Sequence, residues 1–248
     1  MLAWSEHKST QELTSAYKDL LERDRWVCWR YVGNKKVPHS ATSPRRRIDI
    51  SNPQNWHSYT EAIQSVLTNT VDGIGFVLNG DGVVGIDIDD CIDNGRINPI
   101  ANDIMQELGC RLFEISPSGK GLRGFGLGPN LASGVRGHYR GLSIELYSDK
   151  RYLTVTGNAV VAEKLAELTR FEQVAAAIRS SFTEATEVTD ATEATEARWG
   201  GPTTILNPDS IEFPPSCMPR RYRTRNRCIF TLARFLKAHT PPQLWAAT

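Results

Sequence analysis

Long apolar runs, paired cysteines and a strong excess of charge of either sign are all missing from this sequence. The chain has 248 residues, 40% of them hydrophobic and 23% charged, which is typical of a globular protein. Because no run of about 18 apolar residues occurs, we expect no membrane span and no membrane partner. The amino terminus lacks the apolar centre of a signal peptide. A net charge of +1 means that any contact with nucleic acid must come from local charge.

The cysteines also exclude certain classes of protein. The five cysteines are widely spaced and form no C-x-x-C pair. This spacing argues against a disulfide framework and against a structural zinc site. We therefore expect a reducing, cytoplasmic setting.

The hydrophobic pattern predicts an α+β domain over residues 1–182. Capping boxes at Ser9-x-x-Glu12 and Ser58-x-x-Glu61 predict two helix starts, and further helices are expected near 99–108 and 162–182. Strands are expected at 26–32, 73–78, 83–88, 111–115, 143–147 and 152–155. The connections Asn79-Gly-Asp-Gly82 and Ser148-Asp-Lys-Arg151 predict two hairpins.

The composition changes after residue 182. Residues 183–200 are rich in Thr, Ala and Glu and have few large apolar side chains, which predicts a flexible linker. Residues 201–248 end in a basic stretch that begins with Arg220, Arg221 and Arg223 and contains interleaved apolar residues. We interpret this segment as helical and as the start of a truncated second domain, so that the chain is a fragment of a longer protein.

The first chemical signal is the segment Val84-Gly-Ile-Asp-Ile-Asp-Asp90. Side chains alternate along a strand, so Asp87 and Asp89 are predicted to share a face. Two adjacent carboxylates repel each other unless a cation lies between them, which makes a divalent-metal site one interpretation. A solvated acidic turn after a strand is the other. The spacing fits poorly to a calcium loop or to an Asp-x-Asp-x-Thr phosphatase, because Cys91 stands where each pattern needs another residue.

The second signal is a basic, glycine-rich segment that follows a predicted strand, Ser116-Pro-Ser-Gly-Lys-Gly-Leu-Arg-Gly124. Small residues let the backbone approach a ligand, and hydroxyl, N–H and cationic groups bind phosphate oxygens. The candidate phosphate contacts are Ser116, Ser118, Gly119, Lys120, Gly121 and Arg123. The segment is not a Walker A loop, because Gly121 follows Lys120 where that motif needs Ser or Thr. Taken alone, it is more often a plain connection between strands.

The third signal is Glu145 in Ile144-Glu-Leu-Tyr147, where Ile144 and Leu146 are predicted to face the core. This glutamate has a chemical meaning only if its strand lies beside that of Asp87. If it does, Asp87, Asp89 and Glu145 supply the carboxylates that two-metal phosphoryl transfer needs, and the glycine-rich segment supplies a triphosphate site.

The ordered set of motifs resembles the archaeo-eukaryotic primase superfamily, in particular the bifunctional primase/polymerase domains of plasmids and phages. The matching segments are Gly85-Ile-Asp-Ile-Asp89, Ser116-Pro-Ser-Gly-Lys-Gly-Leu-Arg123 and Ile144-Glu-Leu-Tyr147. Four flanking segments are also similar to that family: Trp26-Val-Cys-Trp29, Lys36-Val-Pro38, Gly73-Ile-Gly-Phe76 and Arg151-Tyr-Leu-Thr-Val-Thr-Gly157. The resemblance spans roughly Arg25 to Asn158.

The resemblance implies an RRM-like core built on an antiparallel or mixed sheet with flanking helices. It implies Mg²⁺ or Mn²⁺ held by Asp87, Asp89 and Glu145, NTPs or dNTPs as substrates, and a single-stranded DNA template. It further implies replication of a mobile element, with a helicase in cis or in trans. The family's usual histidine is replaced here by Arg123, which keeps a phosphate contact but cannot donate a proton near neutral pH.

Several other residues are candidates for nucleotide or template contacts. Lys36 and Arg151 belong to the flanking segments of the resemblance and are expected near the nucleotide. Arg45, Arg46 and Arg47 form a basic stretch that is either a template contact or a solvated loop. Two other functions stay open: a degenerate primase fold that binds nucleic acid without synthesis, and another two-metal phosphotransferase or nuclease.

Overall fold

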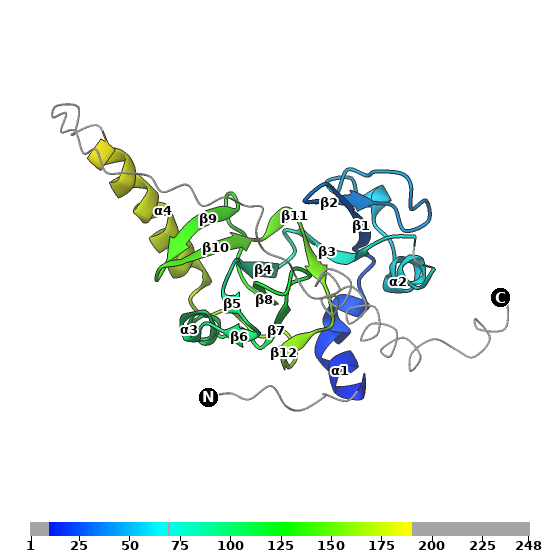
Figure 1. The fold of residues 1–248 in the computed structure, drawn as a ribbon, viewed down its shortest axis with the longest axis horizontal. Helices are drawn as coiled ribbons and strands as arrows, with labels where there is room; N and C mark the ends of the chain where they lie inside the picture. The colour runs from blue at the N-terminus through cyan, green and yellow to red at the C-terminus, as the bar shows by residue number, and fades with distance from the viewer. Residues whose placement is uncertain (1–9, 69, 190–248) are drawn as a thin grey trace, which may run out of the picture.

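The structure, a computed structural model, describes residues 10–68 and 70–189 (Figure 1). Its helices are α1 (Thr10–Leu21), α2 (Tyr59–Leu67), α3 (Pro99–Glu107) and α4 (Phe171–Thr189), with a short 3₁₀ turn η1 (Pro53–Asn55). Its strands are β1 (Trp26–Val32), β2 (Lys35–His39), β3 (Gly73–Asn79), β4 (Val83–Ile88), β5 (Ile92–Asp93), β6 (Arg96–Ile97), β7 (Leu112–Ile115), β8 (Leu122–Leu127), β9 (Val135–Tyr139), β10 (Leu142–Tyr147), β11 (Asp149–Val155) and β12 (Ala159–Ala162).

The described strands form two main sheets and one small hairpin. The four-stranded sheet has the order β11-β3-β1-β2, and the six-stranded sheet has the order β12-β7-β8-β4-β10-β9. Strands β5 and β6 pair only with each other. Every pair of named strands is antiparallel. The predicted α+β class is therefore confirmed.

Two hydrophobic cores hold these layers together. One core joins side chains from both main sheets, such as Phe76 and Phe125, to the apolar faces of α1 and α2. The other lies on the opposite face of the six-stranded sheet, where Val84, Ile86 and Ile88 pack beneath α3 and α4. Because side chains alternate along β4, burial of these three residues turns Asp87 to the face that lies toward the four-stranded sheet.

Local sequence signals located most helix starts correctly. Ser58 caps α2, and its side chain and that of Glu61 complete the predicted capping box. The helix expected near 99–108 forms as α3, where Asn98 is the N-cap and Pro99 the first residue. The strands expected at 26–32 and 83–88 form as β1 and β4.

Both predicted hairpins are wrong. Strands β3 and β4, which flank Asn79-Gly-Asp-Gly82, belong to different sheets, and so do β10 and β11. Each of β3, β4 and β10 is a central strand that already pairs on both sides, so the short turns carry the chain from one sheet to the other. The two crossings are joined where the amide N–H of Gly80 donates to the carbonyl of Ser148 at 3.0 Å.

The helix predicted at 162–182 was also misplaced. Residues Ala159–Ala162 form β12, which pairs with β7, and the helix begins only at Phe171. It continues to Thr189, past the boundary expected at residue 182. The rest of the predicted linker and the basic segment 201–248, which includes Arg220, Arg221 and Arg223, lie outside the described residues.

The described helices and cysteines bear on the expected lack of membrane spans and of disulfides. Within residues 10–68 and 70–189, no helix combines the length and the apolar composition needed to cross a bilayer. Cys28, Cys91 and Cys110 are buried free thiols rather than disulfide partners. Burial raises the pKa of Cys91 to about 11 and that of Cys28 and Cys110 to about 12, so these thiols stay protonated near neutral pH.

Candidate active site

A row of charged side chains crosses the middle of the six-stranded sheet. Glu114 on β7 pairs in register with Arg123 on β8, which pairs with Asp87 on β4. Asp87 in turn pairs with Glu145 on β10, and Glu145 pairs with Arg136 on β9. Residues that are directly opposite each other on antiparallel strands share a face of the sheet. The charges therefore run negative, positive, negative, negative, positive, and like charges meet only at Asp87 and Glu145.

Asp87 is held by Arg123 in a buried, two-point ion pair. The Nε of Arg123 donates to both carboxylate oxygens at 3.2 Å, and its Nη2 donates to Oδ2 at 3.1 Å. Asp87 is only 5% exposed and Arg123 only 8% exposed. The remaining nitrogen, Nη1 of Arg123, is buried and has no hydrogen-bond partner among the described residues. A buried donor without an acceptor is costly, so this nitrogen is suited to bind an anionic ligand.

Glu145 is surrounded by three donors. Its Oε1 lies 2.5 Å from Nε of Arg136, and its Oε2 accepts from Nη2 of Arg151 at 3.1 Å. The hydroxyl of Tyr147 also donates to Oε2, at 2.6 Å. Burial, followed by the contact with Glu145, raises the pKa of Tyr147. The strand of Glu145 lies beside that of Asp87, which is the condition under which Glu145 was expected to take part in the site.

Asp89 lies just past the end of β4 and is exposed. Its pKa is raised first by partial burial, then by the negative charges of Asp87 and Glu145. The three carboxylates thus act on one another electrostatically, as the Asp-x-Asp spacing predicted for the first two. Asp90 follows with a positive φ of 46° and an exposed side chain, so it belongs to the turn rather than to the strand.

The glycine-rich segment connects β7 to β8 as a loop whose two ends, Ser116 and Gly121, are joined by hydrogen bonds. The Ser116 N–H donates to the Gly121 carbonyl at 2.8 Å, and the Gly121 N–H donates to Oγ of Ser116 at 3.2 Å. Gly119 adopts a positive φ of 74°, which glycine tolerates best. The side chains of Ser118 and Lys120 are exposed at the tip. These residues form a small basic loop with free surface for a ligand.

This loop touches the end of β4 that carries the carboxylates. A Cβ atom on Gly121 would lie 2.6 Å from the carbonyl oxygen of Ile88 and 3.5 Å from Cα of Asp89. Only glycine therefore allows the loop and the strand to approach so closely. Arg123, predicted to lie in a loop, in fact lies on β8, which places its guanidinium beside Asp87 rather than at the loop tip.

Lys36 comes to the same place from β2. Burial lowers its pKa, the positive charge of Arg123 lowers it further, and the charges of Asp87 and Asp89 act in the opposite direction. The backbone carbonyl of Lys36 accepts a hydrogen bond from the hydroxyl of Tyr152 on β11, at 2.7 Å. The structure thus brings Lys36 and Arg151, which are far apart in the sequence, to the carboxylates.

Some residues depart from the predicted site. Arg45, Arg46 and Arg47 are exposed on the connection after β2, where Arg46 contacts Asn55 rather than a carboxylate. Arg136 was not predicted to belong to the site, although the Arg140-Gly141 turn close to it in the sequence could have indicated its position. The two residues Arg140 and Gly141 both have positive φ, at 50° and 83°, and join β9 to β10 in a two-residue turn that fixes Arg136 opposite Glu145.

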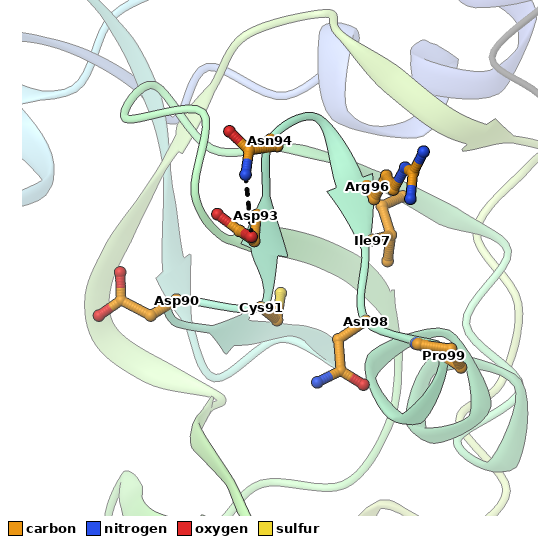
Figure 2. A pocket seen from close by; sticks show the side chains of 8 residues that line it. All are labelled: Asp90, Cys91, Asp93, Asn94, Arg96, Ile97, Asn98 and Pro99. Atoms are coloured by element: carbon orange, nitrogen blue, oxygen red, sulfur yellow. Dashed lines mark hydrogen bonds between the residues drawn. The ribbon is translucent and has the colours of Figure 1, made fainter.

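A polar hollow is lined by Asp90, Cys91, the β5–β6 hairpin and the start of α3 (Figure 2). Figure 2 shows Asp90 on one side of it and Asn98 and Pro99 at the helix start on the other. The Ile92 N–H donates to the carbonyl of Lys120 at 2.8 Å, which attaches this hairpin to the glycine-rich loop.

The carboxylates match a hard divalent cation by their chemistry but not by their present arrangement. Carboxylate oxygens are the preferred ligands of Mg²⁺, and a cation would relieve the repulsion between Asp87 and Glu145. In the described part of the chain, however, no three His, Cys, Asp or Glu side chains converge to hold a metal ion. Arginines instead contact the oxygens of Asp87 and Glu145.

Comparison with known proteins relates part of the chain to a phage DNA primase-polymerase. No protein-family model matches it. Over 147 residues, which are 57% of this chain, it is 31% identical to the DNA Primase-polymerase of Nitratiruptor phage NrS-1. The matched segment covers 20% of the length of that phage protein. The similarity supports a relationship to primase-polymerases.

Proposed function

We propose that this chain carries the catalytic domain of a DNA primase-polymerase, a metal-dependent nucleotidyltransferase that copies a single-stranded DNA template from NTPs or dNTPs. The observation that carries this proposal is the register pair of Asp87 and Glu145 at the centre of the six-stranded sheet. Two buried carboxylates directly opposite each other repel, and such a concentration of charge is typical of a functional site. The similarity to the phage primase-polymerase supports the same activity.

Each part of the site has a role in this proposal. Asp87, Asp89 and Glu145 would hold Mg²⁺ or Mn²⁺, and the bound ions would stabilise the charge that develops on the phosphoryl oxygens. The loop residues Ser116 to Gly121 would bind the triphosphate through N–H and hydroxyl groups. Lys36 and Arg123 would neutralise its charge, because both cations lie beside the carboxylates. Arg151 would keep Glu145 oriented.

We also propose a biological setting. Replication of a phage, plasmid or other mobile element fits the phage origin of the related protein. A helicase, in the same polypeptide or as a separate protein, would then open the duplex and supply the single strand. Exposed arginines at positions 45 to 47 offer positive charge for a template backbone, and Arg220, Arg221 and Arg223 offer more in the segment beyond the described residues.

The test is incorporation of labelled nucleotides on a single-stranded DNA template with Mn²⁺ or Mg²⁺. Asp87→Asn and Glu145→Gln should each lower incorporation by about a hundredfold or more, because each removes a negative ligand. Asp90→Asn is the matched control, since it makes the same charge change in the turn that follows β4. Asparagine also tolerates the positive φ of position 90. Equal activity of Asp87→Asn and Asp90→Asn would rule out the proposed site.

Replacement of the family histidine by Arg123 favours one alternative, a domain that binds nucleotide and DNA without synthesis. In that case the wild-type protein would bind both ligands but incorporate no label. A nuclease or another phosphotransferase would instead shorten the template or release phosphate. The same reactions, analysed for product length and for free phosphate, separate these outcomes.

A further inference from the structure

Arg123 occupies the oxygens that a cation needs on Asp87. Its Nε and Nη2 contact both carboxylate oxygens at 3.1 to 3.2 Å, and both side chains are buried. A guanidinium and a divalent cation carry charge of the same sign and compete for the same lone pairs. A cation therefore binds Asp87 tightly only when Arg123 has another anionic partner.

Glu114, the other neighbour of Arg123 in the charged row, is not available as that partner. It is fully buried, and its two oxygens accept hydrogen bonds from the Tyr17 hydroxyl and from the N–H groups of Thr156 and Gly157, at 2.6 to 2.9 Å. Arg123 also has Nη1 left without a partner among the described residues. The Arg123 side chain thus lies between Glu114, whose oxygens already accept hydrogen bonds from other donors, and Asp87, whose oxygens a cation would also need.

We infer that the Arg123–Asp87 ion pair is a latch that makes divalent-cation binding depend on a bound triphosphate. The inference rests on the proposed function, and it adds the order in which the site is assembled. The triphosphate, held by the glycine-rich loop and Lys36, attracts the guanidinium and satisfies Nη1. The oxygens of Asp87 are released and become available, next to Asp89, for the cation. By linkage, cation and triphosphate then raise each other's affinity by the same factor.

The first experiment measures Mn²⁺ binding without any nucleotide, by the loss of the free Mn²⁺ electron-spin-resonance signal. Arg123→Gln removes the competing cation, so it should bind Mn²⁺ about tenfold more tightly than the wild type. Arg123→Lys keeps a single charge but loses the two-point contact, so its affinity should lie between the two. Equal or weaker Mn²⁺ binding by Arg123→Gln would overturn the latch. In the Arg123→Gln background, Asp87→Asn should abolish the gain.

The second experiment uses the wild-type protein and so does not depend on how well a variant folds. In EDTA, with no divalent ion present, inorganic triphosphate is added while the side-chain Nε–H resonance of Arg123 is followed by NMR. The latch predicts a shift of this resonance, because its hydrogen-bond acceptor changes from carboxylate to phosphate. A resonance that stays in place while triphosphate binds elsewhere would contradict it.

The two experiments also separate the latch from the proposed function. Mn²⁺ binding that depends on Asp87 but does not tighten in Arg123→Gln defeats only the latch. If none of the variants binds Mn²⁺, or if Asp87→Asn leaves Mn²⁺ binding unchanged, both the proposed metal site and the latch are wrong.

Discussion

Glu145 lies directly opposite Asp87 on the neighbouring antiparallel strand, although the two residues are far apart in the sequence. Like charges at such a position weaken a sheet, and here both carboxylates are more than nine-tenths buried. Arg123 on one side and Arg136 and Arg151 on the other offset the repulsion. The arrangement is typical of a functional site, where stability is lost so that charge can be concentrated.

Asp89→Asn should make the protein more stable at neutral pH while it lowers activity. The pKa of Asp89 is raised in the folded state above its ordinary value of 3.8 by burial and by Asp87 and Glu145. A raised carboxyl pKa means that folding favours the proton, so this contribution is complete below the unfolded pKa and is lost as pH rises through the folded pKa. Urea unfolding from acid to neutral pH should show the variant gaining relative to the wild type as pH rises.

The control for this experiment is Asp90→Asn, which makes the same change on an exposed turn residue. It should alter stability less than Asp89→Asn does. A stability difference between wild type and Asp89→Asn that is constant across the pH range would show that the charge of Asp89 does not oppose folding.

Tyr17→Phe should destabilise the domain by about 1–3 kcal/mol, because it removes a hydrogen bond to the buried Glu114 carboxyl, whose Oε2 then keeps the Gly157 N–H but loses the hydroxyl donor. The Tyr17 hydroxyl donates to Glu114 at 2.6 Å and connects α1 to β7 of the six-stranded sheet. Burial raises the pKa of both groups. Chemical denaturation measures the loss. Tyr139→Phe removes a similar bond to Glu107 at the partly exposed surface and should cost less, and equal costs would contradict the argument.

Gly121→Ala should reduce nucleotide affinity as well as stability. Its Cβ would meet the Ile88 carbonyl at 2.6 Å, so either the loop or the end of β4 must shift, at a cost of about 1–3 kcal/mol. Gly95→Ala is the comparison. Position 95 has open space but a φ of 76°, so alanine there costs about 1–2 kcal/mol without contact with the loop. Unfolding curves and binding of a labelled nucleotide distinguish the two, and equal nucleotide affinity would show that the loop is not the phosphate site.

Arg151→Gln should lower kcat/KM for nucleotide incorporation by about tenfold, the effect of one lost charge-assisted hydrogen bond to Glu145. Its guanidinium also lies 4.6 Å from the centre of the Tyr147 ring, which orients it. The neighbouring Lys150→Gln is a matched control, because the Lys150 side chain is 84% exposed and lies 4.0 Å from the carboxylate of Asp149. Equal steady-state losses in the two variants would indicate a general effect of positive charge.

Much of the local structure follows from the sequence. The capping box at Ser58 and the Asn98-Pro99 start of α3 were predicted because capping depends on residues within one helical turn. The alternation around Glu145 also predicted that Ile144 and Leu146 face the core. The motif order located the candidate carboxylates and the glycine-rich loop, since each of these segments is a short, continuous piece of chain.

Other features depend on distant segments and could not be predicted in this way. Asn79-Gly-Asp-Gly82 has the composition of a hairpin, yet it connects two sheets, because β3 and β4 are each already paired on both sides. Strand β8 escaped prediction because three of the residues near it, Gly121, Gly124 and Gly126, interrupt the apolar pattern. Gly124 and Gly126 are required where Cys110 and Leu168 pack against the strand.

The sequence by itself determined which residues are candidates for the proposed chemistry: the acids at 87, 89 and 145 and the basic loop after residue 115. Only the tertiary structure decided that Glu145 pairs with Asp87, that Lys36 approaches from another sheet, and that Arg123 holds Asp87. The physical reason is that side-chain alternation and turn chemistry act over a few residues. Strand order, in contrast, is set by how both sheets bury their apolar faces at once, and that choice places the charges.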